Sequence, residues 1–226
     1  MGFNSTIFNA VSYDFDELIR RASSGTFPIP SGPEKLTATG FSSWVFKLSH
    51  PETIGQTSSL TFSKAKKQEI DIQKMLSRFN DIVVPQLGVF KEKEWEVIYL
   101  DPLTEYTSVH WFETTTLIVG NKKLRCRPDV VLYNKSSKWL LIIERKVEIT
   151  ASSMPNSCYP NILAQLWCYA KIDYKQANWP SPYFILLGAE LWSKERVDYM
   201  KRYYRLWSIT DCVFKKVESL FEIYSR

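Results

Sequence analysis

One apolar run of this chain ends abruptly in three charged residues, and the stretch reads Leu140-Leu141-Ile142-Ile143-Glu144-Arg145-Lys146. A short run that is apolar at consecutive positions is typical of a strand buried on both faces of a sheet. Because side chains alternate along a strand, Glu144 and Lys146 project to the same side as Leu140 and Ile142. Burying an acid and a base is unfavourable unless they pair or bind an ion. The stretch predicts a buried strand over 139–146 whose charged end serves a purpose other than folding.

A second acidic residue, Asp129, follows Pro128 shortly before this run. Mg²⁺ and Mn²⁺ prefer carboxylate, carbonyl and water oxygens, and an amine beside such an ion can handle a proton. An Asp, a Glu and a Lys on neighbouring strands therefore suit hydrolysis of a phosphodiester, whose negative charge must be neutralised before water attacks. Asp129, Glu144 and Lys146 are the catalytic candidates, and the two carboxylates are the candidate ligands of Mg²⁺ or Mn²⁺.

These residues resemble the motif of the PD-(D/E)XK nuclease superfamily. Asp129 matches the first metal-binding aspartate of the family, and Glu144 with Lys146 matches its ExK element. A third element, Gln165-Leu166-Trp167-Cys168-Tyr169, resembles the QxxxY helix motif of the RecB-like branch. The resemblance implies an α/β fold with a restriction-endonuclease-like αβββαβ core, in which helices flank a mixed central sheet.

The resemblance also implies roles for further residues. Gln165 and Tyr169, four apart on one helix face, would lie against the active site and position the lysine or the substrate. The backbone carbonyl of Arg145 would be an additional metal ligand. Glu69 interrupts the apolar stripe of a predicted helix over 62–79, so it either binds the metal or pairs with Lys146 or a nearby arginine.

The order of the predicted elements agrees with such a core. After the helix over 62–79, the chain predicts two strands, a hairpin, the buried strand, a helix, a further strand and a last helix. The two strands are predicted over 83–90 and 95–100, and the hairpin has the arms Ser108–Val119 and Lys123–Tyr133 with a turn at Gly120-Asn121-Lys122. The buried strand is predicted over 139–146, and the helix after it from Pro160 to about 172. The further strand is predicted over Tyr183–Leu187, and the last helix from about 211.

The first part of the chain matches no known pattern. Residues 11–22 predict a short helix with Asp14 or Asp16 near its start, and a loop rich in Ser, Gly and Pro follows. Within 34–60, Trp44-Val45-Phe46 is interpreted as a short strand or a buried anchor. We therefore divide the chain into an N-terminal extension of unknown role, 1–60, and a nuclease-like domain, 61–226.

Composition limits the classes of partner. The 226 residues carry a net charge of +5, which permits a polyanionic partner. Arg125, Arg127 and Lys66 are the candidate nucleic-acid contacts. The stretch 201–205 mixes cations with aromatic rings, as single-strand binding surfaces do, but it equally fits a half-buried strand or helix.

Cysteine usage and hydropathy limit the kinds of metal site and the cellular compartment that the sequence predicts. The cysteines are scattered, without a CxxC pair, which argues against zinc sites. The sequence shows no apolar stretch of membrane-spanning length, so it predicts a soluble, intracellular protein of the cytoplasm or nucleus, with no membrane partner. The sequence leaves open whether the chain forms a homodimer or binds a partner protein.

Three functions compete on these residues. The first is a nuclease dependent on Mg²⁺ or Mn²⁺ that prefers DNA. The second is an RNA endonuclease of the same fold, either a toxin or defence effector or one resembling cap-snatching endonucleases, in which His50 and Glu69 would precede the PD element. The third is a catalytically silent nucleic-acid-binding module. Endo- or exonuclease action and sequence preference do not follow from the sequence.

Overall fold

The computed structural model describes residues 13–51, 95–101, 110–148, 159–196 and 199–226. For 146–148, 190–196 and 199–204 it describes the backbone alone. Within these ranges the helices are α1 (Phe15–Ser23), η1, a 3₁₀ helix (Gly32–Leu36), α2 (Ala38–Ser49), α5 (Pro160–Tyr169) and α6 (Val213–Tyr224). The strands are β1 (Trp95–Leu100), β2 (Phe112–Val119), β3 (Lys122–Cys126), β4 (Val130–Asn134), β5 (Trp139–Glu148), β6 (Phe184–Arg196) and β7 (Tyr199–Ser208). None of the helices in these ranges is long and apolar enough to cross a membrane.

A mixed five-stranded sheet in the order β1-β4-β5-β6-β7 forms the centre of the molecule. The pairs β1/β4 and β4/β5 are antiparallel, whereas β5/β6 is parallel and has α5 as its connection. The last pair, β6/β7, is antiparallel again. The predicted α/β class with a mixed sheet is thus confirmed, and β5 is the middle strand.

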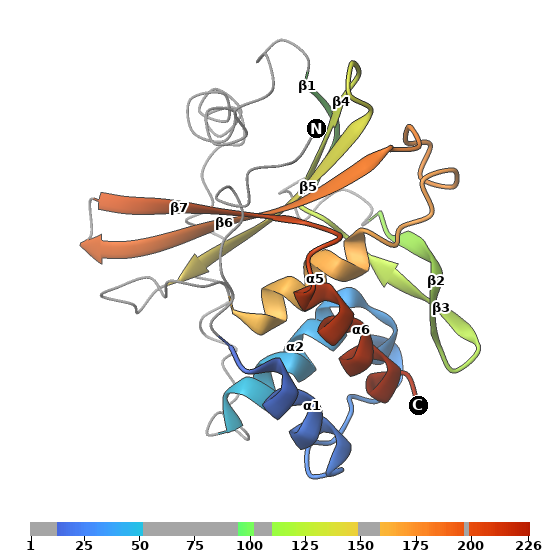
Figure 1. Ribbon diagram of the computed structural model, residues 1–226, viewed down its shortest axis with the longest axis vertical. Helices are drawn as coiled ribbons and strands as arrows, with labels where there is room; N and C mark the ends of the chain where they lie inside the picture. The colour runs from blue at the N-terminus through green and yellow to red at the C-terminus, as the bar shows by residue number, and fades with distance from the viewer. Residues whose placement is uncertain (1–12, 52–94, 102–109, 149–158, 197–198) are drawn as a thin grey trace.

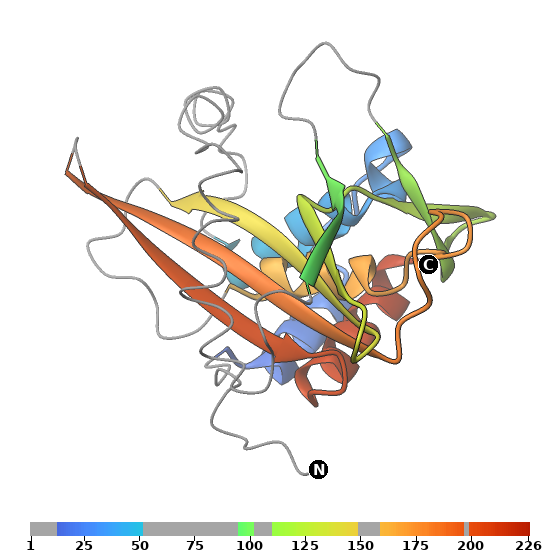
Figure 2. The ribbon, with the colours of Figure 1, turned by 90° about the horizontal axis from the view of Figure 1, so that it is seen from above.

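All four α-helices of the described ranges lie on one face of this sheet (Figures 1 and 2). Leu140 and Ile142 of β5 belong to the core cluster between sheet and helices, whereas Leu141 and Ile143 belong to a cluster on the opposite face. All four side chains are almost fully buried. The consecutive apolar residues therefore reflect a strand covered on both faces, as predicted.

The predicted hairpin is correct in its turn and wrong in its second arm. Gly120 supplies the turn with φ +60, a conformation that glycine adopts without strain. The arm does not continue to Tyr133, because β3 ends at Cys126 and β4 starts at Val130 in a different sheet. Pro128 lies between them and has no N–H to donate to a strand ladder. The Pro-Asp element thus lies where the chain passes from one sheet to the other.

Other differences concern the extent of elements. The strand predicted over Tyr183–Leu187 is the first part of β6, which runs on to Arg196 because it pairs with β5 and β7 on its two sides. The basic-aromatic stretch 201–205 lies in β7, and α5 ends at Tyr169 rather than near 172. The predicted helix 62–79 and strand 83–90 fall outside the described residues.

The N-terminal helices share the core of the main sheet. Trp44 and Val45 are buried anchors, as one interpretation predicted, but they lie in a helix and not in a strand. The core cluster that contains them also contains residues of α1, α5, α6 and β5. The predicted domain boundary at residue 60 falls outside the described ranges.

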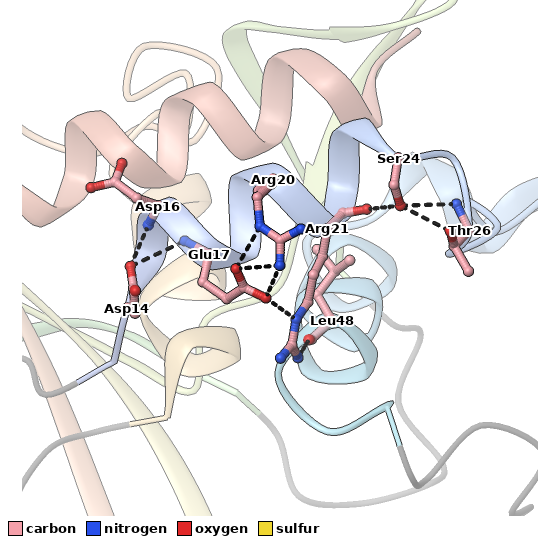
Figure 3. A network of polar contacts seen from close by, with 8 residues as sticks. All are labelled: Asp14, Asp16, Glu17, Arg20, Arg21, Ser24, Thr26 and Leu48. Atoms are coloured by element: carbon pink, nitrogen blue, oxygen red, sulfur yellow. Dashed lines mark hydrogen bonds and ion pairs between the residues drawn. The ribbon is translucent and has the colours of Figure 1, made fainter.

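A polar network ties α1 to α2 (Figure 3). Asp14 caps α1 by accepting hydrogen bonds from the N–H groups of Asp16 and Glu17, which confirms the predicted helix start. Glu17 pairs with Arg20 and Arg21 on the next turn. Arg21 also donates a hydrogen bond of 2.8 Å from Nη1 to the carbonyl oxygen of Leu48, near the end of α2.

Candidate active site

Asp129 and Glu144 lie opposite each other where β4 and β5 come together. Val130 pairs with Ile143 in the antiparallel register, and Asp129 and Glu144 are the next residues beyond that pair. The backbone N–H of Arg145 donates a 2.7 Å hydrogen bond to Oδ2 of Asp129, so this carboxylate is held against β5. The structure therefore brings the two predicted metal ligands to one end of the β4–β5 pair.

Tyr169 of the QxxxY pair on α5 contacts Glu144 directly, and Gln165 contacts Tyr169. The hydroxyl oxygen of Tyr169 lies 3.0 Å from Oε2 of Glu144 and 2.9 Å from the carbonyl oxygen of Arg127, and its single hydrogen can go to either acceptor. The side-chain amide of Gln165 donates to the same hydroxyl. Only 3% of Glu144, 4% of Gln165 and 1% of Tyr169 is exposed, so the network orients Glu144 away from bulk water.

Tyr169 stays protonated over a wide range of pH. Burial, followed by the negative charges of Glu144 and Asp129, raises the pKa of its hydroxyl well above the ordinary value of 10.0. The hydroxyl is therefore a permanent hydrogen-bond donor at neutral pH, which suits the positioning of a carboxylate.

We expect the free energy of unfolding to fall above about pH 10, and part of this fall to depend on Tyr169. Below the pKa that Tyr169 has in the unfolded chain, the tyrosine is protonated in both states, and its contribution to the free energy of unfolding is constant. Above it only the unfolded chain loses the proton, so stability falls by up to about 1.4 kcal/mol per pH unit. Urea unfolding of wild type and Tyr169→Phe from about pH 8 to about pH 11 measures the difference. Tyr183→Phe is the control because that side chain is 85% exposed, and equal slopes for wild type and Tyr169→Phe would contradict the expectation.

A second network, which the sequence analysis missed, holds the Arg127–Asp129 segment from the other side. Oδ1 of Asp101 accepts a hydrogen bond of 2.7 Å from Nε of Arg127 and one of 3.1 Å from the hydroxyl of Tyr99. The N–H of Asp101 donates to the carbonyl oxygen of Asp129 at 2.8 Å. The bond to Asp101 raises the pKa of Arg127, so this guanidinium stays charged. Asp101 thus fixes both the side chain of Arg127 and the backbone of Asp129.

A sequence signal for Asp101 existed. Asp101 follows the apolar strand β1 directly, just as Glu144 follows the apolar part of β5. Pairing of β1 with β4 is what brings it to Asp129, and that pairing cannot be derived from residues 95–101 alone.

The remaining predicted residues lie in different surroundings. Lys146 is in β5, where its backbone is in register with Leu191, and its side chain is outside the described set. Arg125 lies in β3 with its guanidinium carbon 5.3 Å from the ring centre of Trp111. His50 is the C-cap residue of α2. The centre of its ring lies 4.4 Å from that of Phe46, and its Nδ1 lies 2.9 Å from Oγ of Ser49. Glu69 and Lys66 lie outside the described residues.

Two carboxylates of the described residues form the centre of the candidate metal site. No group of three or more His, Cys, Asp or Glu side chains that could hold a metal occurs in the described ranges. Asp129 and Glu144 nevertheless supply the hard oxygen donors that Mg²⁺ and Mn²⁺ prefer. The N–H and C=O of one strand residue point to the same edge, so the carbonyl of Arg145 is expected on the side of Asp129.

Comparison of the chain with protein-family models, with curated proteins and with solved structures finds no match.

Proposed function

We propose that this chain is a nuclease of the PD-(D/E)XK type that depends on Mg²⁺ or Mn²⁺ and acts on DNA in preference to RNA. The observation that carries the proposal is that Asp129 and Glu144 come together from adjacent strands, and that Glu144 contacts Tyr169 of the Gln165–Tyr169 pair on α5. Two carboxylates held in fixed orientations at one end of the β4–β5 pair supply the hard oxygen donors that Mg²⁺ and Mn²⁺ prefer, which supports a bound cation between them.

The topology supports the same proposal. The strands β1, β4 and β5 form an antiparallel set, α5 follows, and β6 returns parallel to β5. This order agrees with the βββαβ portion of the proposed core, and the helix that would precede it is the one predicted over 62–79. The hairpin β2–β3 is an insertion between the first two of these strands.

The chain's own residues have separable tasks in this proposal. Asp129, held by the N–H of Arg145, and Glu144, held by Tyr169, present carboxylate oxygens in fixed orientations. A bound Mg²⁺ or Mn²⁺ would neutralise the phosphodiester and lower the pKa of a water molecule. Lys146 stands two residues after Glu144 on β5, a spacing that places both on one face of a strand, and it would hold or transfer the proton of the attacking water.

The contacts of His50 bear on the alternative of an RNA endonuclease. Its ring stacks on Phe46, and Ser49 bonds its Nδ1, which is the surrounding of a packing residue. DNA is preferred in the proposal because Glu144 and Lys146 of the ExK element and the Gln165–Tyr169 pair are all present. A silent binding module would keep the same carboxylates without turnover.

We expect Lys146→Ala to abolish cleavage, with a loss of rate of at least about 100-fold because proton handling is removed. Labelled single- and double-stranded DNA and RNA are incubated with Mg²⁺, Mn²⁺ or EDTA, and initial rates are compared. Lys215→Ala is the matched control, because Lys215 is exposed on α6.

The outcomes separate the competing functions. Cleavage of DNA that needs metal and disappears in Lys146→Ala supports the proposal, and the same pattern on RNA alone favours the second function. Activity that survives in Lys146→Ala points to a contaminating nuclease or a different site. Absence of cleavage on every substrate favours the silent module.

A further inference from the structure

The outer face of the β2–β3 hairpin combines cations with an exposed tryptophan. Its members, which we call the hairpin face, are Trp111, Lys123 and Arg125. Trp111 is 36% exposed, Lys123 is exposed and Arg125 is half-buried. Ile118, cross-strand from Lys123, is 43% exposed. Such a mixture of aromatic and cationic side chains differs from an ordinary solvated strand face, which is polar throughout.

The hairpin face continues along the chain to the candidate active site. Burial alternates strictly from 124 to 130, with Leu124, Cys126, Pro128 and Val130 buried. The residues between them, Arg125, Arg127 and Asp129, are all partly exposed, and Lys123 begins the same series. Since alternate residues of a strand point to one side, Lys123 and Arg125 share one face of β3, and Arg127 beyond the end of β3 is held by Asp101 beside Asp129.

The hairpin is fixed to the body of the molecule. Thr37 bridges to Arg125 on one edge, and Thr114 bridges to Ile172 on the other. The N–H of Thr115 also donates to the carbonyl oxygen of Lys171 at 2.8 Å. Figure 1 shows the hairpin beside the end of α5. Its outer face therefore keeps a constant position relative to the site, as a substrate track requires.

We propose that the hairpin face binds single-stranded nucleic acid and directs it toward Asp129 and Glu144. The inference rests on the proposed function, because it names the substrate class of that same site. Trp111 stacks on a base, and Lys123 and Arg125 contact the phosphates on either side. A duplex keeps its base faces stacked inside, so only a single strand can use the tryptophan.

Two contacts prepare the hairpin face for this ligand. The guanidinium of Arg125 lies 5.3 Å from the ring centre of Trp111, which steadies the ring by a cation–π interaction. Lys123 pairs with Glu113 at 3.8 Å, and both side chains are more than 40% exposed. An exposed pair of this length is weak, so a phosphate can replace the carboxylate.

Binding without cleavage tests the inference. Fluorescence anisotropy in EDTA measures Kd for labelled single-stranded DNA, single-stranded RNA and duplex DNA of one sequence. We expect Trp111→Ala to weaken single-strand binding about 5- to 100-fold and to leave the weaker duplex binding unchanged. The double variant Lys123→Gln/Arg125→Gln should reduce the slope of log K against log salt by about 1.4, the value for two phosphate contacts. Lys215→Gln on α6 is the control and should leave Kd and slope unchanged.

The outcomes distinguish this inference from the proposed function. Kd and salt slope that stay unchanged in both variants overturn the inference, and so does equal affinity of the wild type for single strand and duplex. If such variants still cleave DNA with metal, the proposed function survives that result. If binding depends on Trp111 but no substrate is cut, the inference stands and the proposed function fails.

Discussion

Replacing Glu144 by glutamine is expected to abolish metal-dependent cleavage and to leave the protein folded. The amide oxygen of glutamine can still accept a hydrogen bond from the hydroxyl of Tyr169, which lies 3.0 Å from Oε2 of Glu144. The negative charge that would bind the cation is lost, however. Because a bound metal ion contributes several kcal/mol of charge stabilisation in the transition state, and Glu144→Gln would weaken its binding, kcat should fall by at least about 1,000-fold. Because glutamine has nearly the same size and shape as glutamate, the side chain, which is 3% exposed, still fits its surroundings.

Initial rates with Mg²⁺ and Mn²⁺, together with the melting temperature, measure both parts of this result. Glu218→Gln is the matched control, since Glu218 is exposed on α6. Binding of single-stranded DNA in EDTA should be unchanged in Glu144→Gln, because the hairpin face and not the metal site provides that affinity. Normal cleavage by Glu144→Gln would remove the carboxylate from the mechanism, and a large fall in melting temperature would give Glu144 a structural role.

Gly40→Ala is expected to destabilise the protein by about 3 kcal/mol, although alanine is the better helix former. A Cβ at residue 40 would lie 2.1 Å from the backbone carbonyl oxygen of Glu34 and 3.1 Å from the hydroxyl oxygen of Tyr224. The carbonyl cannot move freely, because Thr37 donates to it from both its N–H and its hydroxyl. The hydroxyl of Thr37 in turn caps α2 by accepting the N–H of Gly40. The extra methyl group therefore separates η1 from α2.

The melting temperature should fall by about 6–12 °C for a protein of this size. Ser43→Ala is the matched control in the same helix, where the side chain is half-buried and alanine should be neutral or slightly stabilising. Equal or greater stability of Gly40→Ala would mean that the carbonyl of Glu34 does not lie over this part of α2.

The local patterns of the sequence predicted several elements correctly. The run of apolar residues before Glu144 indicated a strand buried on both faces, and β5 is such a strand. The strand over 95–100 and the start of α5 at Pro160 are also confirmed. These features follow from neighbouring residues, because periodicity and the missing N–H of proline act over a few positions.

The errors occur where contacts distant in sequence determine the outcome. The second hairpin arm predicted over Lys123–Tyr133 is divided in the structure, because β3 pairs with β2 and β4 pairs with β1 and β5. β6 was expected to end at Leu187, but its pairing with both β5 and β7 extends it. The sequence around Trp44 fits either a short strand or a buried anchor, because packing against Tyr224 and other rings distant in sequence is what buries Trp44 in α2.

For the candidate site, the sequence by itself determined the residue types and their order along the chain. It gives an aspartate after Pro128, Glu144 and Lys146 two residues apart on one strand, and Gln165 and Tyr169 one turn apart on a helix. Only the tertiary structure decided that Tyr169 bonds Glu144, that the N–H of Arg145 holds Asp129, and that Asp101 anchors Arg127. The physical reason is that strand register and helix docking are set by burial of apolar side chains throughout the core, and hydrogen bonds between distant residues form only once that register is fixed.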